Sequence, residues 1–190
     1  MPSSRIFFKA ERLVSPYPGL QLPAGLSFEI GPGLTLLRGG DGRGKTTVLR
    51  LIAGSVASCC FETPADEAHD AFVACAWLAA RRRLFSHWQA DVEADLIDRF
   101  GLAEHMDKPM FMLSTGSRRK VGLLAAAASG AALTLIDTPF AALDASACRV
   151  LGGLLAEAAN SRDRAWVMAD YERPASLVGV EFAGVIDLGD

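Results

Sequence analysis

The segment GGDGRGKTT, residues 39–47, decides the fold class of this 190-residue chain. It fits the pattern G-x-x-x-x-G-K-[ST] through Gly39, Gly44, Lys45 and Thr46. The strand-like run from Leu34 to Leu37 precedes it, and the helix-like VLRLIAG follows it. In that context the glycines let backbone N–H groups converge on phosphate oxygens, and the helix adds the positive end of its dipole. The sequence therefore predicts a phosphate-binding loop.

All nine residues of the loop are candidates for binding a nucleotide: Gly39, Gly40, Asp41, Gly42, Arg43, Gly44, Lys45, Thr46 and Thr47. We expect Lys45 to neutralise charge on the β- and γ-phosphates, and the Thr46 hydroxyl to ligate Mg²⁺. The alternative is a glycine-rich turn that binds nothing. The register of the lysine and threonine, between a strand and a helix, argues against that alternative.

A second informative stretch is LTLIDTPFAALD, residues 133–144, in which a buried strand runs directly into Asp137. A carboxylate at the end of an apolar strand is costly unless it meets a partner. Beside a phosphate loop, that partner is predicted to be the Mg²⁺ held by the nucleotide, reached directly or through water. The alternative is a structural carboxylate that caps a nearby turn.

Strand-like and helix-like segments alternate along the chain, which predicts an α/β fold with a mainly parallel sheet. Short strands are expected at residues 6–8, 26–30, 34–37, 133–136, 165–168 and 185–188. Trp88 to Phe100 has apolar residues at helical spacing, and Ser114 is a candidate cap for a helix that runs to about Ser129. We expect one domain over residues 1–190, with a helical lobe at about 75–128 inserted in the core.

Composition excludes several classes of protein. About half of the residues are apolar and the net charge is only −3, so we expect no nucleic-acid-binding surface. The four cysteines have neither zinc-site nor disulfide-framework spacing, which favours reduced thiols in a cytoplasmic protein. The N-terminus has no signal-peptide pattern, and the longest apolar run, Val121 to Ile136, is too short to span a bilayer.

The sequence LSTGSRRKVGLLAAAASGAALTLIDTPFAALD, residues 113–144, resembles ATP-binding cassette (ABC) ATPases. In that family a signature segment, typically LSGGQ, opens a helix, and a strand ending in D-E-P and an A-L-D loop follow. Here LSTGS, DTP and ALD occupy those places at residues 113–117, 137–139 and 142–144. The resemblance implies a P-loop NTPase of ABC type, with a parallel sheet flanked by helices, a small N-terminal antiparallel β region and a shortened helical lobe.

The resemblance also implies a head-to-tail dimer that binds two ATP molecules with Mg²⁺ at its interface. Ser114 and Gly116 would contact the γ-phosphate held by the partner, and Asp144 would lie at the same interface. Tyr17 is at the place of the aromatic residue that stacks on adenine, although a tyrosine between prolines could equally be a turn residue. The implied partners are a second copy or a different ABC ATPase subunit, and a membrane-embedded transporter subunit. Through that subunit the protein would be peripheral at the inner face of the membrane.

Three positions depart from the family pattern. Thr138 occupies the place of the catalytic glutamate, and a hydroxyl is a poor base. The switch histidine is expected about 33 residues later, where WVMADYERP offers Asp170 or Tyr171. The glutamine of the family is expected in or near AWLAARRRLFSHW, residues 76–88, which contains none. Within that segment, residues 81–83 are three arginines, either a solvated basic turn or a surface for an acidic partner.

Two functions remain open from the sequence. The first is the ATP-binding subunit of an ABC transporter, an ATPase in which hydrolysis is weakened. The second is a non-hydrolysing nucleotide-binding module with a regulatory or structural role.

Overall fold

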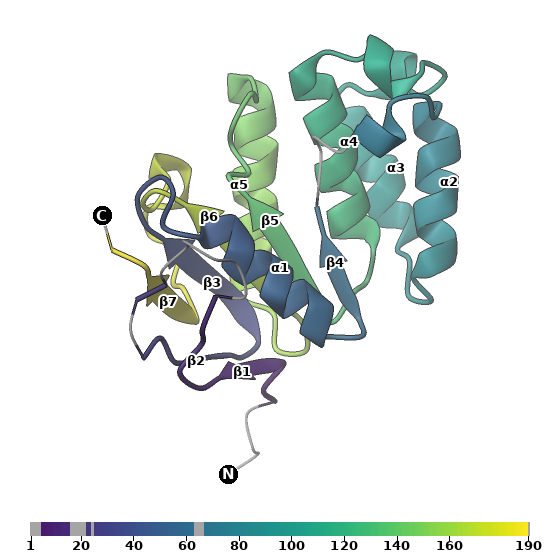
Figure 1. Ribbon diagram of the computed structural model, residues 1–190. Helices are drawn as coiled ribbons and strands as arrows, with labels where there is room; N and C mark the ends of the chain where they lie inside the picture. Colours follow the sequence, from purple (N-terminus) through teal and green to yellow (C-terminus); the bar gives the residue numbers. More distant parts are fainter. Residues whose placement is uncertain (1–4, 16–21, 24, 63–66, 190) are drawn as a thin grey trace.

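The computed structural model describes residues 5–15, 22–23, 25–62 and 67–189. At the centre of this part of the chain lies a five-stranded sheet in which neighbouring strands are parallel (Figure 1). The strand order is β4 (Cys59–Phe61), β5 (Leu133–Asp137), β6 (Ala165–Asp170), β3 (Gly33–Arg38) and β7 (Gly184–Asp187). The predicted α/β fold with a mainly parallel sheet is confirmed.

Helices cover both faces of the sheet, so its central strands are almost continuously apolar. On one face, α1 (Lys45–Ser55) packs on the sheet together with a two-stranded antiparallel sheet of β1 (Phe8–Ala10) and β2 (Phe28–Ile30). On the other face lie α4 (Thr115–Ala128) and α5 (Ala145–Ala159). The antiparallel pair confirms the predicted N-terminal β region, although β1 lies two residues later than the expected strand.

The helical lobe consists of α2 (Ala74–Leu84) and α3 (Ala90–Arg99), which pack on α4 away from the centre of the sheet (Figure 1). Four 3₁₀ turns complete the described elements: η1 (Glu67–His69), η2 (Ala103–His105), η3 (Met110–Met112) and η4 (Ala175–Leu177). Because α4 lies between the lobe and the sheet, its alanine-rich stretch is buried all round. No helix among the described residues is long and apolar enough to cross a membrane.

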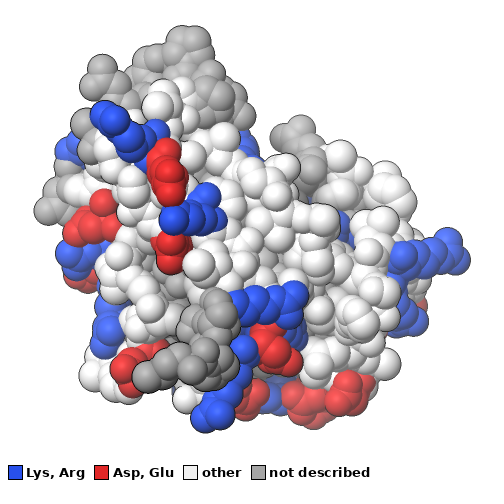
Figure 2. Space-filling view, turned by 90° about the horizontal axis from the view of Figure 1, so that it is seen from below, with Lys and Arg blue, Asp and Glu red and all other residues white. Residues whose placement is uncertain are grey.

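Side chains of both charges are scattered over the end of the molecule that carries the two-stranded sheet, and some of them form ion pairs (Figure 2). There Lys9 pairs with Glu11 and Glu29, and all three side chains are about half exposed or more. Such exposed pairs contribute little to stability. On this face, positive and negative side chains are interspersed rather than gathered into one basic area.

The arginine run lies in the last turn of α2 rather than in a turn between elements. Arg82 donates two hydrogen bonds to the Glu93 carboxylate, at 2.7 and 2.9 Å. The Arg81 guanidinium lies over the rings of Trp77 and Phe85. Two of the three arginines therefore pack within the lobe, so neither a fully solvated turn nor a free basic surface describes the run.

Candidate functional site

The carboxyl ends of β3, β5 and β6 meet at one edge of the sheet, where Arg38 pairs with Asp170 and Asp137 with Ala169 in register. The phosphate loop leaves β3 at this edge and enters α1 through Gly44. Gly44 has φ 92°, a left-handed conformation that strains any residue with a Cβ. The loop borders a cleft of about 400 Å³, a size typical of small-ligand sites. Its lining residues are Asp41, Gly42, Gly44, Lys45, Thr46, Thr47, Asp137 and Thr138.

Three predicted loop residues do not line this cleft. Gly39 and Gly40 lie behind it, and their carbonyl oxygens accept hydrogen bonds from Lys45 Nζ at 2.6 and 2.8 Å. The Gly40 N–H donates to the Gly189 carbonyl, which lies just beyond β7, at 2.9 Å. Arg43 is exposed. The loop is thus braced from behind by the last described strand.

The Thr46 hydroxyl and the Asp137 carboxylate both line the cleft and are in direct contact. Thr46 Oγ1 donates to Asp137 Oδ2 at 2.5 Å, although 91 residues separate the two in the chain. Hydroxyl and carboxylate oxygens are the hard ligands that Mg²⁺ prefers, and a lysine beside them suits phosphate charge. The chemistry of these residues therefore fits a magnesium–nucleotide complex, with Thr46 and Asp137 at the metal and Lys45 and the loop at the phosphates.

Thr138 follows Asp137 in a strained backbone conformation. Its φ is +43°, which is unusual for a β-branched residue. Its N–H donates to the Ala169 carbonyl at 2.8 Å, and its own carbonyl accepts from Arg119 at 2.8 Å. Strained backbone of this kind concentrates at functional sites. Thr138 lines the cleft at the position where the sequence analysis looked for a carboxylate base.

Arg119, on α4, holds the turn that contains Thr138, a role that no pattern in the sequence indicates. Besides the Thr138 carbonyl, its guanidinium donates to the Asp137 carbonyl. On its other side it lies 3.6 Å from the Glu62 carboxylate. A basic residue in the second turn of a helix has no pattern that reveals such a contact. Only the packing of α4 beside the ends of β4 and β5 brings the three residues together.

Glu62 is the second functional residue that the sequence analysis missed. It follows β4 directly, and its N–H donates to the Leu135 carbonyl at 3.0 Å, so it lies beside the strand that ends in Asp137. Its side chain is fully buried, and neither carboxylate oxygen has a hydrogen-bond partner among the described residues. Burial raises the pKa of Glu62 to about 7, against the opposing effect of the Arg119 charge.

Residues 76–88, where the glutamine was expected, do not lie beside β5, the strand that ends in Asp137. Most of that segment forms α2, which packs on α4 in the helical lobe. The strand adjacent to β5 is β4, and the residue after it is Glu62. Because β4 has only three residues and follows α1 closely, no clear strand pattern marked the position of Glu62 in the sequence.

Asp170 ends β6 next to the phosphate loop, and Tyr171 follows it. Asp170 is half-buried, and its carboxylate accepts the Tyr171 N–H at 2.8 Å. Burial raises the pKa of Asp170. Tyr171 is the residue that faces the loop: its ring centroid lies 4.5 Å from Lys45 Nζ. Of the two candidates at this place, the tyrosine rather than the aspartate contacts the phosphate-binding lysine.

The signature segment lies at the start of α4, and none of residues 113–117 lines the cleft. Ser114 caps α4 as predicted, since its Oγ accepts from the Ser117 N–H at 3.0 Å. A Cβ on Gly116 would lie 2.6 Å from the Ala142 carbonyl oxygen, so only glycine allows this approach. Asp144 caps α5 through the Ala147 N–H at 2.8 Å. Tyr17 lies outside the described residues.

Comparisons with known proteins agree with this arrangement. Residues 24–141 match the family described as ABC transporter. The chain is 31% identical over 177 residues to the cytochrome c biogenesis ATP-binding export protein CcmA of Paramagnetospirillum magneticum, covering 79% of this chain and 81% of that protein. It is 35% identical over 97 residues to the phosphonates import ATP-binding protein PhnC of Chromohalobacter salexigens, covering 48% of this chain and 36% of that protein.

Solved structures show the same fold. An ABC transporter ATP-binding protein from Pyrococcus furiosus superposes with a TM-score of 0.75 at 17% identity, covering 95% of this chain and 96% of that one. An inward-facing metal-chelate type ABC transporter gives a TM-score of 0.74 at 21% identity, covering 97% of this chain and 81% of that one. The fold, the phosphate loop facing Asp137 and the family match over more than half of the sequence agree, and the chain belongs to the ABC transporter family.

Proposed function

We propose that this protein is the ATP-binding subunit of an ABC-type transporter that binds MgATP in the cleft beside the phosphate loop. The observation that carries the proposal is the contact of Thr46 with Asp137 at 2.5 Å beside Lys45. The contact supports the proposal because two oxygen atoms of the kind that ligate Mg²⁺ and one cation of the kind that binds phosphate lie in a single cleft. When bound, MgATP would supply the phosphoanhydride and the metal charge, and the protein would supply position and electrostatic support.

A head-to-tail dimer is part of this proposal. Ser114 and Asp144 are exposed, and neither they nor Gly116 line the cleft of their own chain. A nucleotide held by the loop would therefore meet these residues only on a second subunit. The N-terminus of α4, with the Ser114 hydroxyl beside it, suits an anion such as a γ-phosphate. The second subunit is either another copy or a different ABC ATPase subunit.

We propose that hydrolysis by this chain is weak. Thr138 lines the cleft at the position of the base, and its hydroxyl orients a water molecule without accepting its proton near neutral pH. The nearest replacement carboxylate on the neighbouring strand, Glu62, is fully buried and does not line the cleft. A positioned general base contributes about 10²–10⁴-fold to a rate. Loss of that factor leaves binding intact and turnover low.

The export proteins of cytochrome c biogenesis match this chain over most of both lengths, and we extend the proposal to a membrane subunit of the exporter kind. The protein would then be cytoplasmic and peripheral at the inner face of the membrane through that subunit. The second candidate function is a non-hydrolysing regulatory module. It is favoured by the same observation, an intact binding set beside Thr138.

Steady-state phosphate release and calorimetric MgATP binding test the proposal together. We expect the wild-type protein to bind MgATP and Lys45→Ala to bind none. We expect Thr138→Glu to release phosphate faster than the wild type. Absence of MgATP binding by the folded wild-type protein would refute the ATP-binding role. Binding with no turnover in either wild type or Thr138→Glu would favour the regulatory module. Size-exclusion chromatography with light scattering of Thr138→Ala plus MgATP tests the dimer, which should form only with nucleotide.

A further inference from the structure

Three groups of the same chain contact the Lys45 ammonium group. The group has three hydrogens, and Nζ donates to the carbonyl oxygens of Gly39 and Gly40 at 2.6 and 2.8 Å. The Tyr171 ring lies beside the same nitrogen, with its centroid 4.5 Å away. This distance is well within the range of a cation–π contact. As a result, Lys45 is only 8% exposed although it lies in a phosphate loop at the surface of a cleft.

The Tyr171 ring is also anchored at its far end. Its hydroxyl lies beside the carboxylate of Asp41, which raises the pKa of the tyrosine. Asp41 is itself an exposed residue of the phosphate loop. Tyr171 therefore spans the loop from β6, touching Lys45 with its ring and Asp41 with its hydroxyl. The side chain is still 50% exposed, so nothing packs over it to prevent rotation.

This arrangement opposes the binding of a phosphate group. The ring occupies one side of the lysine that a β- or γ-phosphate must contact. The Asp41 carboxylate, held at the mouth of the loop, repels an incoming anion. A nucleotide thus has to displace the tyrosine and separate it from Asp41 before Lys45 becomes available. The apparent affinity falls by the fraction of molecules in which the tyrosine has moved away.

We propose that Tyr171 is a gate on the phosphate loop, whose ring covers Lys45, must move aside before a phosphate reaches that lysine, and so sets the affinity for nucleoside di- and triphosphates. The inference deepens the proposed function, since it concerns the same nucleotide site and rests on its binding nucleotide. Tyr171 acts through Lys45 and Asp41. Its role is to control access to the phosphate-binding cation, without a part in the chemistry of hydrolysis.

Binding kinetics of a fluorescent ATP analogue by stopped flow, with calorimetry of ADP and MgATP, test the gate. Tyr171→Ala should bind both nucleotides about ten-fold more tightly, through a faster association rate, because a cation–π contact and its anchor no longer compete. Tyr171→Phe should lie between wild type and Tyr171→Ala, since it keeps the ring over Lys45 and loses the anchor. Asp41→Asn should shift association in the same direction as Tyr171→Phe.

Phe111 provides a matched control, because it is an exposed aromatic residue, 65% accessible, on η3 in the helical lobe. Phe111→Ala should leave association and affinity at the wild-type values. Equal or weaker binding by a folded Tyr171→Ala would overturn the gate, since weaker binding identifies the tyrosine as a phosphate contact. Nucleotide binding by neither wild type nor Tyr171→Ala, with both proteins folded by circular dichroism, would overturn the ATP-binding function itself. The two failures are therefore distinguishable.

Discussion

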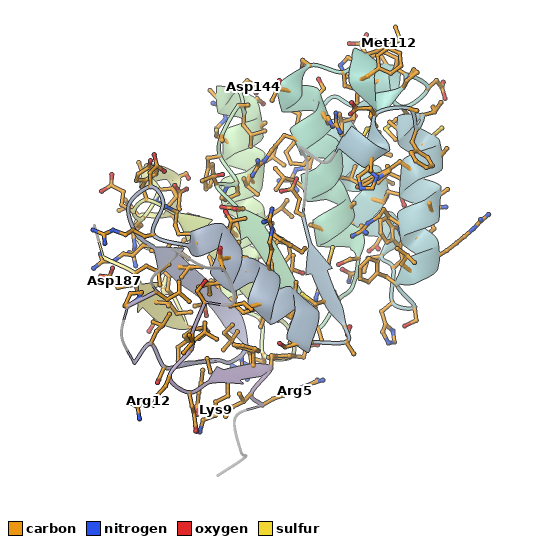
Figure 3. The ribbon with its side chains drawn as sticks, viewed as in Figure 1. Arg5, Lys9, Arg12, Met112, Asp144 and Asp187 are labelled. Carbon is orange, nitrogen blue, oxygen red and sulfur yellow. The ribbon has the colours of Figure 1, made fainter. Side chains whose placement is uncertain are left out.

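Lys120 and Asp144 join the signature helix to the loop before α5: Lys120 Nζ lies 2.6 Å from Asp144 Oδ2. Figure 3 shows Asp144 at the start of α5. The hydrogen bond from Lys120 is the main reason that the pKa of Asp144 falls to about 2, and the capping N–H of Ala147 adds to it. Asp144 is thus a fixed anion at the edge where the second subunit is proposed to dock. The same carboxylate caps the start of α5 and binds Lys120 of α4.

Replacing Lys120 should therefore release Asp144. In Lys120→Ala the pKa of Asp144 is expected to rise from about 2 toward the ordinary value of 3.8. Because the folded pKa is depressed, the stabilising contact is present above pH 3.8 and is lost as the pH falls toward 2. Carbon-detected NMR titration of the Asp144 carboxyl measures this. An unchanged titration in Lys120→Ala would show that the helix cap alone sets the pKa.

Gly116 should tolerate no side chain. In Gly116→Ala the new Cβ would lie 2.6 Å from the Ala142 carbonyl oxygen, which belongs to backbone with φ +61° and cannot yield easily. We expect a loss of about 1–3 kcal/mol in the free energy of unfolding, as for other overpacked positions. Urea denaturation followed by circular dichroism measures it.

Gly153, in the middle of α5, is the matched control for that substitution. A Cβ there meets only the end of the Arg99 side chain at 3.9 Å, an ordinary contact. Gly153→Ala should stabilise the protein by about 0.5–1 kcal/mol through helix propensity. Equal effects of the two substitutions would contradict the close approach of α4 and the loop at Ala142.

Glu62 should make stability depend on pH. Its folded pKa of about 7 lies above the ordinary 4.5, so the folded state favours the protonated acid. That contribution is complete below pH 4.5 and is lost as the pH rises through 7. Relative to Glu62→Gln, the wild-type protein should lose up to about 3 kcal/mol between pH 4.5 and pH 8. Denaturant unfolding at both pH values measures the difference, and the exposed Glu181→Gln should show none.

Substitutions of Thr46 and Thr47 should distinguish loss of Mg²⁺ binding from a general disturbance of the phosphate loop. Thr46→Val removes the hydroxyl that meets Asp137, so MgATP should bind no more tightly than ATP in EDTA. Thr47→Val changes the neighbouring cleft residue in the same way and should keep the Mg²⁺ enhancement. Calorimetric titrations with and without Mg²⁺ give the ratio for each variant. An enhancement that survives in Thr46→Val would remove Thr46 from the metal site.

The sequence allowed good predictions wherever a local pattern has a direct physical cause. The phosphate loop needs glycines at set positions, and Ser114 signals a helix start because its oxygen satisfies a free backbone N–H. The long buried strands were clear from apolar runs. The sequence analysis assigned both Thr46 and Asp137 to Mg²⁺, and in the structure their side chains are in contact.

Contacts between distant elements could not be predicted in this way. Nothing around Arg119 indicates that its guanidinium reaches the carbonyls of Asp137 and Thr138. Glu62 follows a three-residue strand that is too short to show a period, so its position beside the magnesium site was missed. The spacing in the sequence did not show which of Asp170 and Tyr171 contacts Lys45, because neighbouring residues in extended backbone point to opposite sides.

The bond between Gly40 and Gly189 has a practical consequence for expression and assay design. The phosphate loop is held from behind by backbone just past β7, and a Cβ on Gly39 would already approach the Gly189 oxygen to 3.0 Å. A variant truncated before Gly189 would lose this support for the loop, so nucleotide binding should be measured on a chain that retains Gly189.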